Sequence, residues 1–332
     1  MRTNILLSII IPCYNVEKFI KNTLNSILEE NLEDYEIILI NDGSVDNTLS
    51  IIQEYSRIYK FIKIITQKNQ GVSEARNIGI KYSEGKYIYF LDGDDYLVKG
   101  ELKKNLEILK ETYEIIIFKN YIRYKNKLFS IKNNLKTGKY SRNEILENIF
   151  SKKILKCVIG NFIVKKELIL KNNIEFERKY SYSEDYNFII RCILRSKYLY
   201  FLNQEVFVYR RHEKSAMFKK INLTRLDSIK AIYDLEKIIL LEKNNRLSNS
   251  YYYFFNMALI GNINELIRKK SKYKDVKIYL RYLEEYKIKK LNLEYMALNF
   301  QLVLYLIFFK LYSINKIILY FILKILIFLF KL

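Results

Sequence analysis

Short apolar runs alternate with segments of helical periodicity over the first 120 residues. The apolar runs predict strands over Leu7–Ile11, Glu36–Ile40, Lys63–Thr66, Tyr87–Leu91 and Glu114–Phe118. The periodic segments predict helices over Val16–Leu28, Ser44–Tyr59, Ser73–Tyr82 and Glu101–Thr112. Strands that alternate with helices in this way are typical of a parallel sheet covered on both faces. The pattern therefore predicts an α/β fold whose ligands bind where the strands end.

The pattern changes twice after this region. Residues 121–215 are mixed: a capping-box sequence from Ser141 to Glu144 opens a helix to about Phe150, a second helix is expected over Tyr186–Arg195, and residues 205–212 indicate a strand. Residues 222–332 are almost wholly helical in pattern. We therefore expect two domains, an α/β domain over residues 1–220 and a helical region over residues 221–332.

The last part of the chain is apolar but interrupted by lysines. Lys310, Lys316, Lys324 and Lys331 fall within an arc of about 120° on a helical wheel. A spanning helix needs about 20 uninterrupted apolar residues, and the sequence has no such run. The pattern favours a helix that lies in the membrane interface with its lysines toward lipid phosphates. The alternative is a helix packed on the domain or on a second copy of the chain, which would make a homodimer.

The composition indicates a kind of binding partner, through the net charge, and a cellular compartment, through the cysteines. Lys and Arg number 57 against 36 Asp and Glu, a net charge of +21. This excess indicates an anionic partner, which could be nucleic acid, an acidic membrane surface or an anionic substrate. The three cysteines, Cys13, Cys157 and Cys192, have no CxxC spacing, which favours a reducing cytoplasm over a zinc site or a disulfide framework. Since no small-residue cleavage site follows Ile5–Ile11, we interpret this run as a buried strand, not a signal peptide.

Two polar clusters follow the first two predicted strands. The first is Pro12-Cys13-Tyr14-Asn15, and the second contains Asn41-Asp42-Gly43-Ser44. A carboxylate such as that of Asp42 can accept hydrogen bonds from a nucleobase N–H or a ribose hydroxyl, and Gly43 lets the backbone approach a ligand. The alternative is a plain strand-to-helix turn, because all four residue types of the second cluster favour turns.

A helix start follows the third predicted strand, in the segment Gln70–Gly79. Ser73 is the expected N-cap residue of this helix. Arg76, one turn into the helix, could face a nucleotide. The alternative is a capped helix with an arginine on its surface.

An acidic loop, Asp92-Gly93-Asp94-Asp95, directly follows the predicted strand Tyr87–Leu91. Three carboxylates within four residues repel one another, and a bound cation relieves that repulsion. Mg²⁺ and Mn²⁺ prefer oxygen ligands and commonly bridge one or two carboxylates to a diphosphate. The loop therefore predicts a divalent metal site, with a solvated acidic turn as the alternative.

Two further clusters carry chemistry later in the chain. Glu184 and Asp185 stand at a predicted helix N-terminus, which stabilises an ionised carboxylate able to accept a proton; a helix cap is the alternative. His212, the single histidine, follows Arg210 and Arg211 and could bind a metal or contact a diphosphate. A structural histidine is the alternative there.

Taken together, these segments resemble the inverting family 2 glycosyltransferases of GT-A fold. The matching segments are IIIPCYN, EIILINDGSVDNT, QGVSEARNIGI, YIYFLDGDDYL, SEDYNF and YRRHEKSA, and they occur in the family's order over about residues 5–216. The chain has no Trp, so the QxxRW motif of processive synthases is absent, as are the several spanning helices of those enzymes. The resemblance thus implies a GT-A type, mostly parallel sheet between helices, and transfer of a single sugar.

The resemblance also implies a role for each matching position. The implied nucleotide-binding residues are Pro12, Tyr14, Asn15, Asp42, Arg76 and Asp92. The implied metal ligands, for Mn²⁺ or Mg²⁺, are Asp94, Asp95 and His212. Asp185 is the implied general base, with Glu184 as the second candidate. Arg211 and Ser215 are expected to contact the diphosphate.

The predicted function is metal-dependent, inverting transfer of one sugar from a nucleotide sugar, with UDP favoured by the resemblance, to an acceptor hydroxyl. The lysine pattern of the C-terminal segment places this reaction peripherally on the cytoplasmic face of the inner membrane, on a growing surface glycan or glycolipid. Two alternatives from other classes are a basic nucleic-acid- or lipid-binding protein without activity and a nucleotidyltransferase that makes sugar nucleotides. The acidic loop argues against a nucleic-acid partner, because it would repel phosphate without a metal. The nucleotidyltransferase would need a Gly- and Arg-rich loop after the first strand, where this chain has Pro12-Cys13-Tyr14-Asn15.

Overall fold

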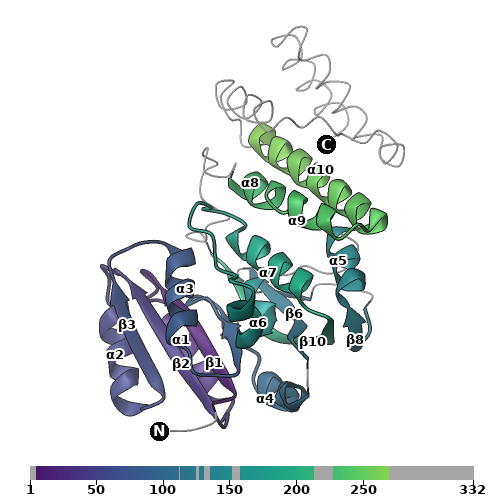
Figure 1. Ribbon diagram of the computed structural model, residues 1–332. Helices are drawn as coiled ribbons and strands as arrows, with labels where there is room; N and C mark the ends of the chain where they lie inside the picture. The colour runs from purple at the N-terminus through teal and green to yellow at the C-terminus, as the bar shows by residue number, and fades with distance from the viewer. Residues whose placement is uncertain are drawn as a thin grey trace. The chain divides into compact units, whose positions relative to one another are not determined.

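The computed structural model describes residues 5–111, 113–124, 127–130, 135–151, 158–212 and 227–268. The chain divides into two compact units, Met1–Lys219 and Lys220–Leu332. Within the described residues of the first unit, ten strands form one sheet flanked by helices (Figure 1). An α/β fold with a central sheet between helices, as predicted, is therefore confirmed.

The first half of the sheet is parallel. It contains β1 (Leu7–Cys13), β2 (Tyr35–Asp42), β3 (Ile62–Gln67) and β4 (Tyr87–Phe90), in the order β3-β2-β1-β4. Each strand lies within two residues of its predicted bounds. The register pairs Cys13 with Asn41, so the loops after β1 and β2 leave the sheet at the same edge.

The second half of the sheet is mixed, and the apolar pattern gave no sign of this. Strand β9 (Phe162–Lys165) lies between β4 and β6 (Ile115–Tyr124) and is antiparallel to both. Strand β10 (Tyr198–Arg211) is parallel to β6 and begins seven residues before its predicted start at 205. Three short antiparallel strands complete the sheet: β5 (Tyr96–Leu97), β7 (Lys127–Ser130) and β8 (Gly138–Ser141).

The helices of the first unit follow the predicted order. They are α1 (Ile20–Leu28), α2 (Thr48–Ile58), α3 (Val72–Tyr82), α4 (Glu101–Asn105), α5 (Arg142–Phe150), α6 (Lys166–Lys171) and α7 (Glu184–Arg195), with 3-10 turns η1 (Leu106–Lys110) and η2 (Ile159–Asn161). The predicted capping box at Ser141 is confirmed, since its hydroxyl accepts from the Glu144 N–H and the Glu144 carboxylate accepts from the Ser141 N–H. Helices α1 and α2 each begin four residues later than predicted, after loops that build the functional edge.

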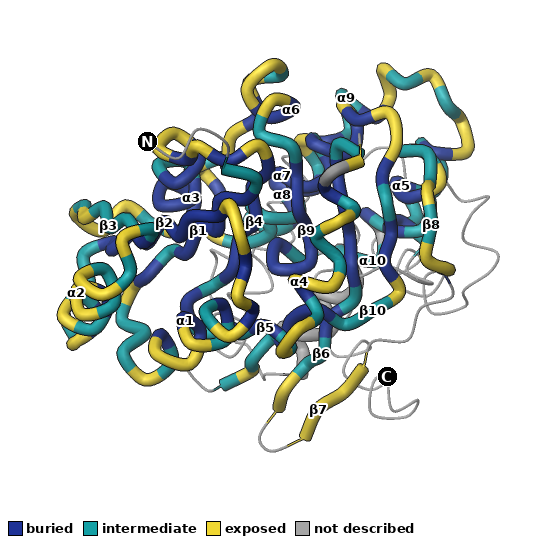
Figure 2. Tube along the Cα trace, turned by 90° about the horizontal axis from the view of Figure 1, so that it is seen from below, coloured by how far each residue is buried: buried dark blue, intermediate teal, exposed yellow. Residues whose placement is uncertain are grey.

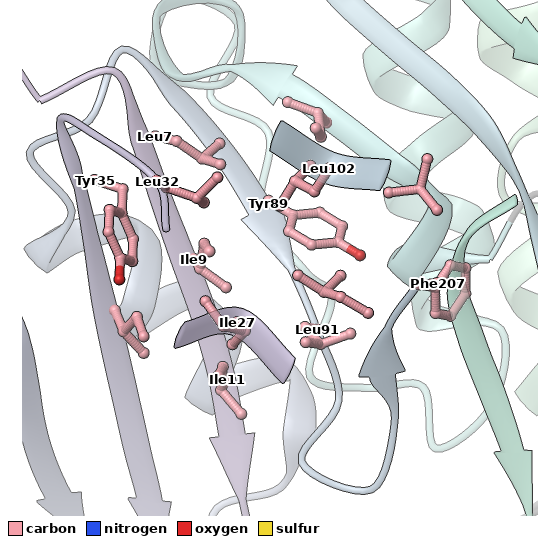
Figure 3. Packing of buried hydrophobic residues seen from close by; sticks show 14 of the residues in the cluster. Leu7, Ile9, Ile11, Ile27, Leu32, Tyr35, Tyr89, Leu91, Leu102 and Phe207 are labelled. Atoms are coloured by element: carbon pink, nitrogen blue, oxygen red, sulfur yellow. The ribbon is translucent and has the colours of Figure 1, made fainter. Parts of the chain in front are cut away.

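The two faces of β1 carry different helices. Leu7, Ile9 and Ile11 belong to a core cluster that includes α1 residues such as Ile27 (Figure 3). Ile10 points to the opposite face and meets α3 at Gly79, where an added Cβ would lie 2.2 Å from its Cγ2. Strands β1 and β2 are buried along almost their whole length, whereas all four residues of β7 are exposed (Figure 2). Helix α3 therefore sits close to the strand because residue 79 has no side chain.

A buried polar network closes the edge where the parallel strands begin. The Glu36 carboxylate accepts hydrogen bonds from the Ser8 hydroxyl and the Glu84 N–H, both at 2.6 Å, and pairs with the Lys63 ammonium at 2.9 Å. Glu84 also pairs with Lys63, at 2.6 Å, but its side chain is 61% exposed. Glu36 thus has a partner for each oxygen, as a buried charge requires.

The second unit contains helices α8 (Asp227–Tyr233), α9 (Glu236–Leu241) and α10 (Asn245–Arg268). Tyr251 of α10 donates to the Ile232 carbonyl at 2.9 Å, and Tyr252 donates to the Glu236 carboxylate at 2.7 Å, so α10 packs on the two shorter helices. No helix in the described part of the chain is both long and apolar enough to cross a bilayer. The lysine-striped segment from Lys310 to Lys331 lies outside the described residues, so its predicted membrane contact stays a prediction.

Candidate functional site

Two loops at the carboxyl edge of the sheet are joined by hydrogen bonds. Asn15, in the left-handed conformation with φ 54°, accepts from the Val45 N–H at 2.9 Å, and its own N–H donates to the Ser44 hydroxyl at 3.2 Å. The Val16 N–H donates to the Thr48 hydroxyl at 2.9 Å. Tyr14 remains 49% exposed beside these contacts. The loops that contain Pro12, Tyr14 and Asn15 are thus a fixed structure, with one aromatic ring left free for a ligand.

Asp42 ends β2 and is buried. Its carboxylate accepts hydrogen bonds from the Gln67 amide at 2.7 Å, the Gln70 N–H at 2.8 Å and the Gly71 N–H at 2.9 Å. Two of these donors are backbone groups at the start of α3. Asp42 therefore fixes the N-terminus of that helix, in addition to the nucleotide contact predicted for it.

The prediction that Ser73 caps α3 is wrong. The N-cap residue is Gly71, whose φ of 89° suits glycine, and the Ser73 hydroxyl instead donates to the Glu177 carbonyl at 3.3 Å. The Asp42 carboxylate accepts from the N–H groups of Gln70 and Gly71, which precede the first turn whose N–H groups a cap side chain would meet. The Ser73 hydroxyl thus forms a hydrogen bond between α3 and the segment before α7.

Arg76 lies one turn into α3 and its side chain is 3% exposed. The two Nη groups pair with Asp92 at 2.8 Å and with Glu184 at 2.9 Å. Burial opposes its charge, but Asp92, Glu184 and Asp185 together hold the pKa of Arg76 above its ordinary value. The guanidinium therefore links the loop after β4 to the start of α7, and Arg76, which was predicted to face a nucleotide, is buried between two carboxylates.

The acidic loop after β4 is hydrogen-bonded to a threonine of α1. Thr23, buried in α1, donates to the carbonyls of Gly93 and Asp95, at 3.0 and 2.6 Å. In the same loop, the Asp94 carboxylate lies 2.8 Å from Nε2 of His212. Asp94 and His212, 118 residues apart, are thus brought together as predicted, and both side chains remain partly exposed.

Asp95 is buried, unlike Asp94 beside it in the chain. It is 2% exposed and accepts a hydrogen bond from the Arg210 N–H at 2.8 Å. Burial, with Asp94 and Asp92 nearby, holds the pKa of Asp95 well above its ordinary value. In the described residues, no group of three or more His, Cys, Asp or Glu side chains is arranged to hold a metal. The fit to a cation is therefore restricted to the Asp94–His212 pair, whose remaining ligands would come from a diphosphate and water.

Glu184 and Asp185 form the first turn of α7, after Ser183 in the left-handed conformation. The Glu184 carboxylate forms an ion pair with Arg76. Asp185 accepts from the Tyr186 N–H at 2.7 Å. Burial, with Glu184 beside it, raises the pKa of Asp185 to about 7, while Arg76 opposes the rise. A carboxylate with this pKa suits proton transfer at neutral pH, which favours Asp185 over Glu184 as the base.

The end of β10 completes the edge. His212 stacks on Phe19, with ring centroids 4.5 Å apart, and the Arg210 guanidinium lies 5.1 Å from the same ring. Arg211 is exposed. Ser215, predicted to contact the diphosphate, lies outside the described residues.

Sequence reasoning missed Thr23, Phe19 and Asn77 as parts of this site. Thr23 had a usable signal, since a polar residue stands on the apolar face that Ile20, Leu24 and Ile27 define in α1. Phe19 and Asn77 gave none, because their partners lie about 100 residues away or more, at His212 and Phe176.

Comparisons with known proteins agree with this geometry. The family model described as Glycosyl transferase family 2 matches residues 8–171. Glu184, Asp185 and His212 lie beyond that match, so their grouping with Arg76 and Asp94 is a finding of the structure. S. aureus TarS 1-349 in complex with UDP-GlcNAc superposes with a TM-score of 0.72 at 21% identity, over 85% of this chain and 80% of that chain. This likeness shows a shared fold.

Two curated relatives extend the match. EpsJ of Bacillus subtilis, an uncharacterized glycosyltransferase, is 29% identical over 215 residues, which is 63% of this chain and 62% of EpsJ. An uncharacterized glycosyltransferase of Haemophilus influenzae is 30% identical over 320 residues, which is 86% of this chain and 98% of that protein. With a relative matched over nearly its whole length and a family model over the functional loops, the chain belongs to glycosyltransferase family 2 and is a glycosyltransferase.

Proposed function

We propose that this glycosyltransferase moves a single sugar from a UDP-sugar to an acceptor hydroxyl, with inversion at the anomeric carbon and with the help of Mn²⁺ or Mg²⁺. The observation that carries the proposal is the gathering of carboxylates at one edge of the sheet. Arg76 joins Asp92 to Glu184 at 2.8 and 2.9 Å, and Asp185 follows directly on α7. Such a loop cluster would provide three things: a carboxylate that accepts hydrogen bonds from a base or ribose, ligands for a cation, and a carboxylate that accepts a proton.

The nucleotide would lie over the loops after β1 and β2. Tyr14, 49% exposed, offers a ring on which a base can stack. Asp42 already accepts three hydrogen bonds, so a base N–H would take its remaining acceptor position or replace the Gln67 amide. Asp92, with a side chain 33% exposed, is accessible to ribose or phosphate. TarS, whose fold this chain shares, was solved with UDP-GlcNAc, and that complex supports UDP as the carrier.

Asp94 and His212 would hold the divalent cation. Their side chains lie 2.8 Å apart and are 27% and 20% exposed, so a cation could enter between them. A bound cation supplies Lewis-acid neutralisation of the charge that develops on the leaving diphosphate. Arg211, exposed at the end of β10, lies beside His212 in the chain and can add a positive charge at the same end.

Asp185 would act as the base. Its carboxylate takes the proton from the acceptor hydroxyl while that oxygen forms a bond to the anomeric carbon. The bond from this carbon to the diphosphate oxygen breaks on the opposite face, and its electron pair leaves with UDP. One displacement of this kind inverts the configuration and needs one carboxylate, unlike the paired carboxylates of glycoside hydrolysis.

The acceptor would be a growing surface glycan or a glycolipid on the cytoplasmic face of the membrane. The support is the lysine pattern of the C-terminal segment and the net charge of +21, which suit an anionic lipid surface. Truncation after Asn299 should release the protein from sedimenting membranes if this segment is the anchor.

The proposal is tested by calorimetric titration with UDP, GDP and dTDP, each with and without Mn²⁺. We expect UDP to bind in a metal-dependent way and Asp94→Ala to lose the effect of the metal, with an affinity at least tenfold weaker. Glu33→Ala, which removes an exposed carboxylate from the turn before β2, is the matched control and should bind as the wild type does.

Binding of GDP or dTDP instead of UDP would refute UDP as the carrier, but it would still agree with transfer from a nucleotide sugar. Equal UDP affinity with and without metal, in both the wild type and Asp94→Ala, would refute the role of the Asp94–His212 pair. The nucleotidyltransferase and nucleic-acid alternatives are disfavoured by the family of the chain.

A further inference from the structure

We propose that Asn77 is a positioning residue for the base at Asp185, and that helix α3 acts through it as a clamp on the segment from Phe176 to α7. The inference rests on the proposed function, because it assigns a mechanical role within that reaction. The side-chain amide of Asn77 bonds to the backbone of Phe176 and not to a carboxylate of the site, so its effect on catalysis would pass through the segment that it holds.

The clamp uses both ends of one side-chain amide. Nδ2 of Asn77 donates to the Phe176 carbonyl at 2.9 Å, and the Phe176 N–H donates to Oδ1 of Asn77 at 2.8 Å. Both backbone groups of a residue 99 positions away are thereby satisfied by a single side chain. Such a pair fixes the direction of the segment as well as its distance from α3.

Neighbouring residues of α3 hold the next two residues of the segment. The Ser73 hydroxyl donates to the Glu177 carbonyl at 3.3 Å, and the Glu74 carboxylate pairs with Nε of Arg178 at 2.6 Å. Arg178 is 66% exposed, so this ion pair contributes little by itself. The amide clamp at Asn77 is therefore the main polar link between α3 and the segment.

Phe176 carries the connection from α3 to α7. Its ring lies under the Arg76 guanidinium, 5.2 Å from ring centroid to Cζ, and stacks on Phe188 of α7 with centroids 3.9 Å apart and an interplanar angle of 6°. Phe90 of β4 meets Phe176 edge-on at 5.2 Å. A shift of Phe176 would therefore move α7, on whose first turn Asp185 stands.

The same helix also holds the donor side of the site. Asp42 fixes the N-terminus of α3 through Gln70 and Gly71, and Arg76 reaches Asp92 and Glu184. Helix α3 thus sets the distance between the donor loops and the base. Since displacements near 1 Å can cost about 100-fold in rate, loss of the clamp should slow the chemical step more than it weakens nucleotide binding.

The test compares Asn77→Ala with the wild type in two assays. UDP release from a UDP-sugar with water as the acceptor gives kcat, and calorimetry with UDP and Mn²⁺ gives Kd. The UDP-sugar is whichever of UDP-GlcNAc, UDP-GalNAc, UDP-glucose and UDP-galactose the wild type hydrolyses fastest. We expect kcat to fall about tenfold and the Kd for UDP to stay within about twofold.

A pH profile separates positioning from simple destabilisation. Asp185 faces Glu184 on its own helix, Arg76 on α3 and Asp92 after β4, and its ionised form is favoured by Arg76 and by the Tyr186 N–H. If the segment moves away from Arg76 in Asn77→Ala, the acidic limb of the kcat profile should shift to higher pH. A protein that is merely less stable would keep the wild-type limb at low temperature.

The controls keep the inference falsifiable. Asn148→Ala removes an amide that donates to the Glu144 carbonyl within α5, at 2.8 Å, and should leave kcat and Kd unchanged. Asn77→Asp keeps the acceptor for the Phe176 N–H but sets a carboxylate oxygen against the Phe176 carbonyl, so its kcat should fall at least as far as that of Asn77→Ala. This variant provides the test if Asn77→Ala does not fold. An active wild type with unchanged kcat in both Asn77 variants, or with an equal loss of kcat and UDP affinity, overturns the positioning role alone. A wild type that binds no UDP and hydrolyses no UDP-sugar overturns the proposed function and this role with it.

Discussion

Glu36 and Asp95 are buried carboxylates at opposite edges of the parallel half of the sheet, and their surroundings differ. At the edge where the strands begin, Glu36 is 1% exposed and has the Ser8 hydroxyl, the Glu84 N–H and the Lys63 ammonium as partners. Burial alone would raise the pKa of Glu36, but these partners hold it below its ordinary value. At the edge where the strands end, Asp95 and Asp185 have raised pKa values because burial and neighbouring carboxylates act together.

This difference separates structural from functional charge. A carboxylate that serves the fold is surrounded by donors, since an unpaired buried charge costs free energy. At the other edge Asp42 is likewise held by three donors, whereas Asp92 and Glu184 share Arg76 as a buried cation. Groups with perturbed pKa values in a loop cluster are typical of sites whose missing partner is a ligand. The raised pKa values of Asp95 and Asp185 therefore favour the loop after β4 and the start of α7 as the reactive part of that edge.

The largest effect is expected from the base. Asp185→Asn keeps the shape of the side chain but cannot accept a proton, so kcat for UDP release from a UDP-sugar should fall about 1,000-fold. Glu184→Gln keeps a hydrogen-bond acceptor for Arg76 and should lose much less. Equal losses in the two variants would mean that the two carboxylates act as a unit, contrary to the roles assigned here.

A pH effect of intermediate size should follow from the same residue. Asp185 must be ionised to accept a proton, and its pKa is raised to about 7. The kcat should therefore fall about tenfold for each pH unit below 7 and level off above it. The measurement is kcat from steady-state rates at a series of pH values from about 5.5 to about 8.5, which bracket that pKa. A profile that stays flat down to pH 5.5 would contradict the assignment.

The smallest effects are expected at the opposite edge and concern stability. Glu36→Gln places an amide beside Lys63 and should lower the free energy of unfolding by about 2 kcal/mol at pH 7. Because the folded pKa of Glu36 lies below its ordinary value of 4.5, its stabilisation is present above that pH and is lost as pH falls through the folded value. The difference between variant and wild type in urea unfolding should shrink accordingly.

Glu84→Gln is the matched control for that variant, since it removes the other partner of Lys63. The Glu84 side chain is 61% exposed, so the loss should stay below about 0.5 kcal/mol. Both variants should keep the wild-type kcat per folded molecule. A larger loss in Glu84→Gln than in Glu36→Gln would show that Lys63, not the buried carboxylate, carries the network.

Periodicity was enough to predict the parallel strands and most helices, because each reflects local burial. It could not place β9, whose four residues, Phe162–Lys165, join two strands distant in sequence and leave no pattern of their own. The start of β10 did have a signal that the prediction overlooked, since Tyr198–Leu202 is an apolar run rich in aromatic residues, which pairs with β8 and β6.

The site was predictable as a set of loops but not as a set of contacts. Asp42, Asp92 and Asp94 follow strands whose ends the pattern places at one edge, whereas Asp185 was predicted only at the start of a helix. The engagement of Arg76 with two carboxylates and the burial of Asp95 depend on side-chain packing across long separations in the chain. The Ser73 cap prediction failed because the helix begins earlier, at Val72, with Gly71 in the N-cap position.

The missing side chain at Gly79 has a consequence for how this family can vary. An added Cβ would lie 2.2 Å from Cγ2 of Ile10, so any replacement must lift α3 from β1. The helix carries Arg76 and Asn77 within three residues of that contact, and a lift would move both away from their partners. Selection on sugar transfer therefore acts on a residue with no functional group at all. Among natural variants and in mutant libraries, position 79 should tolerate as little change as the base itself.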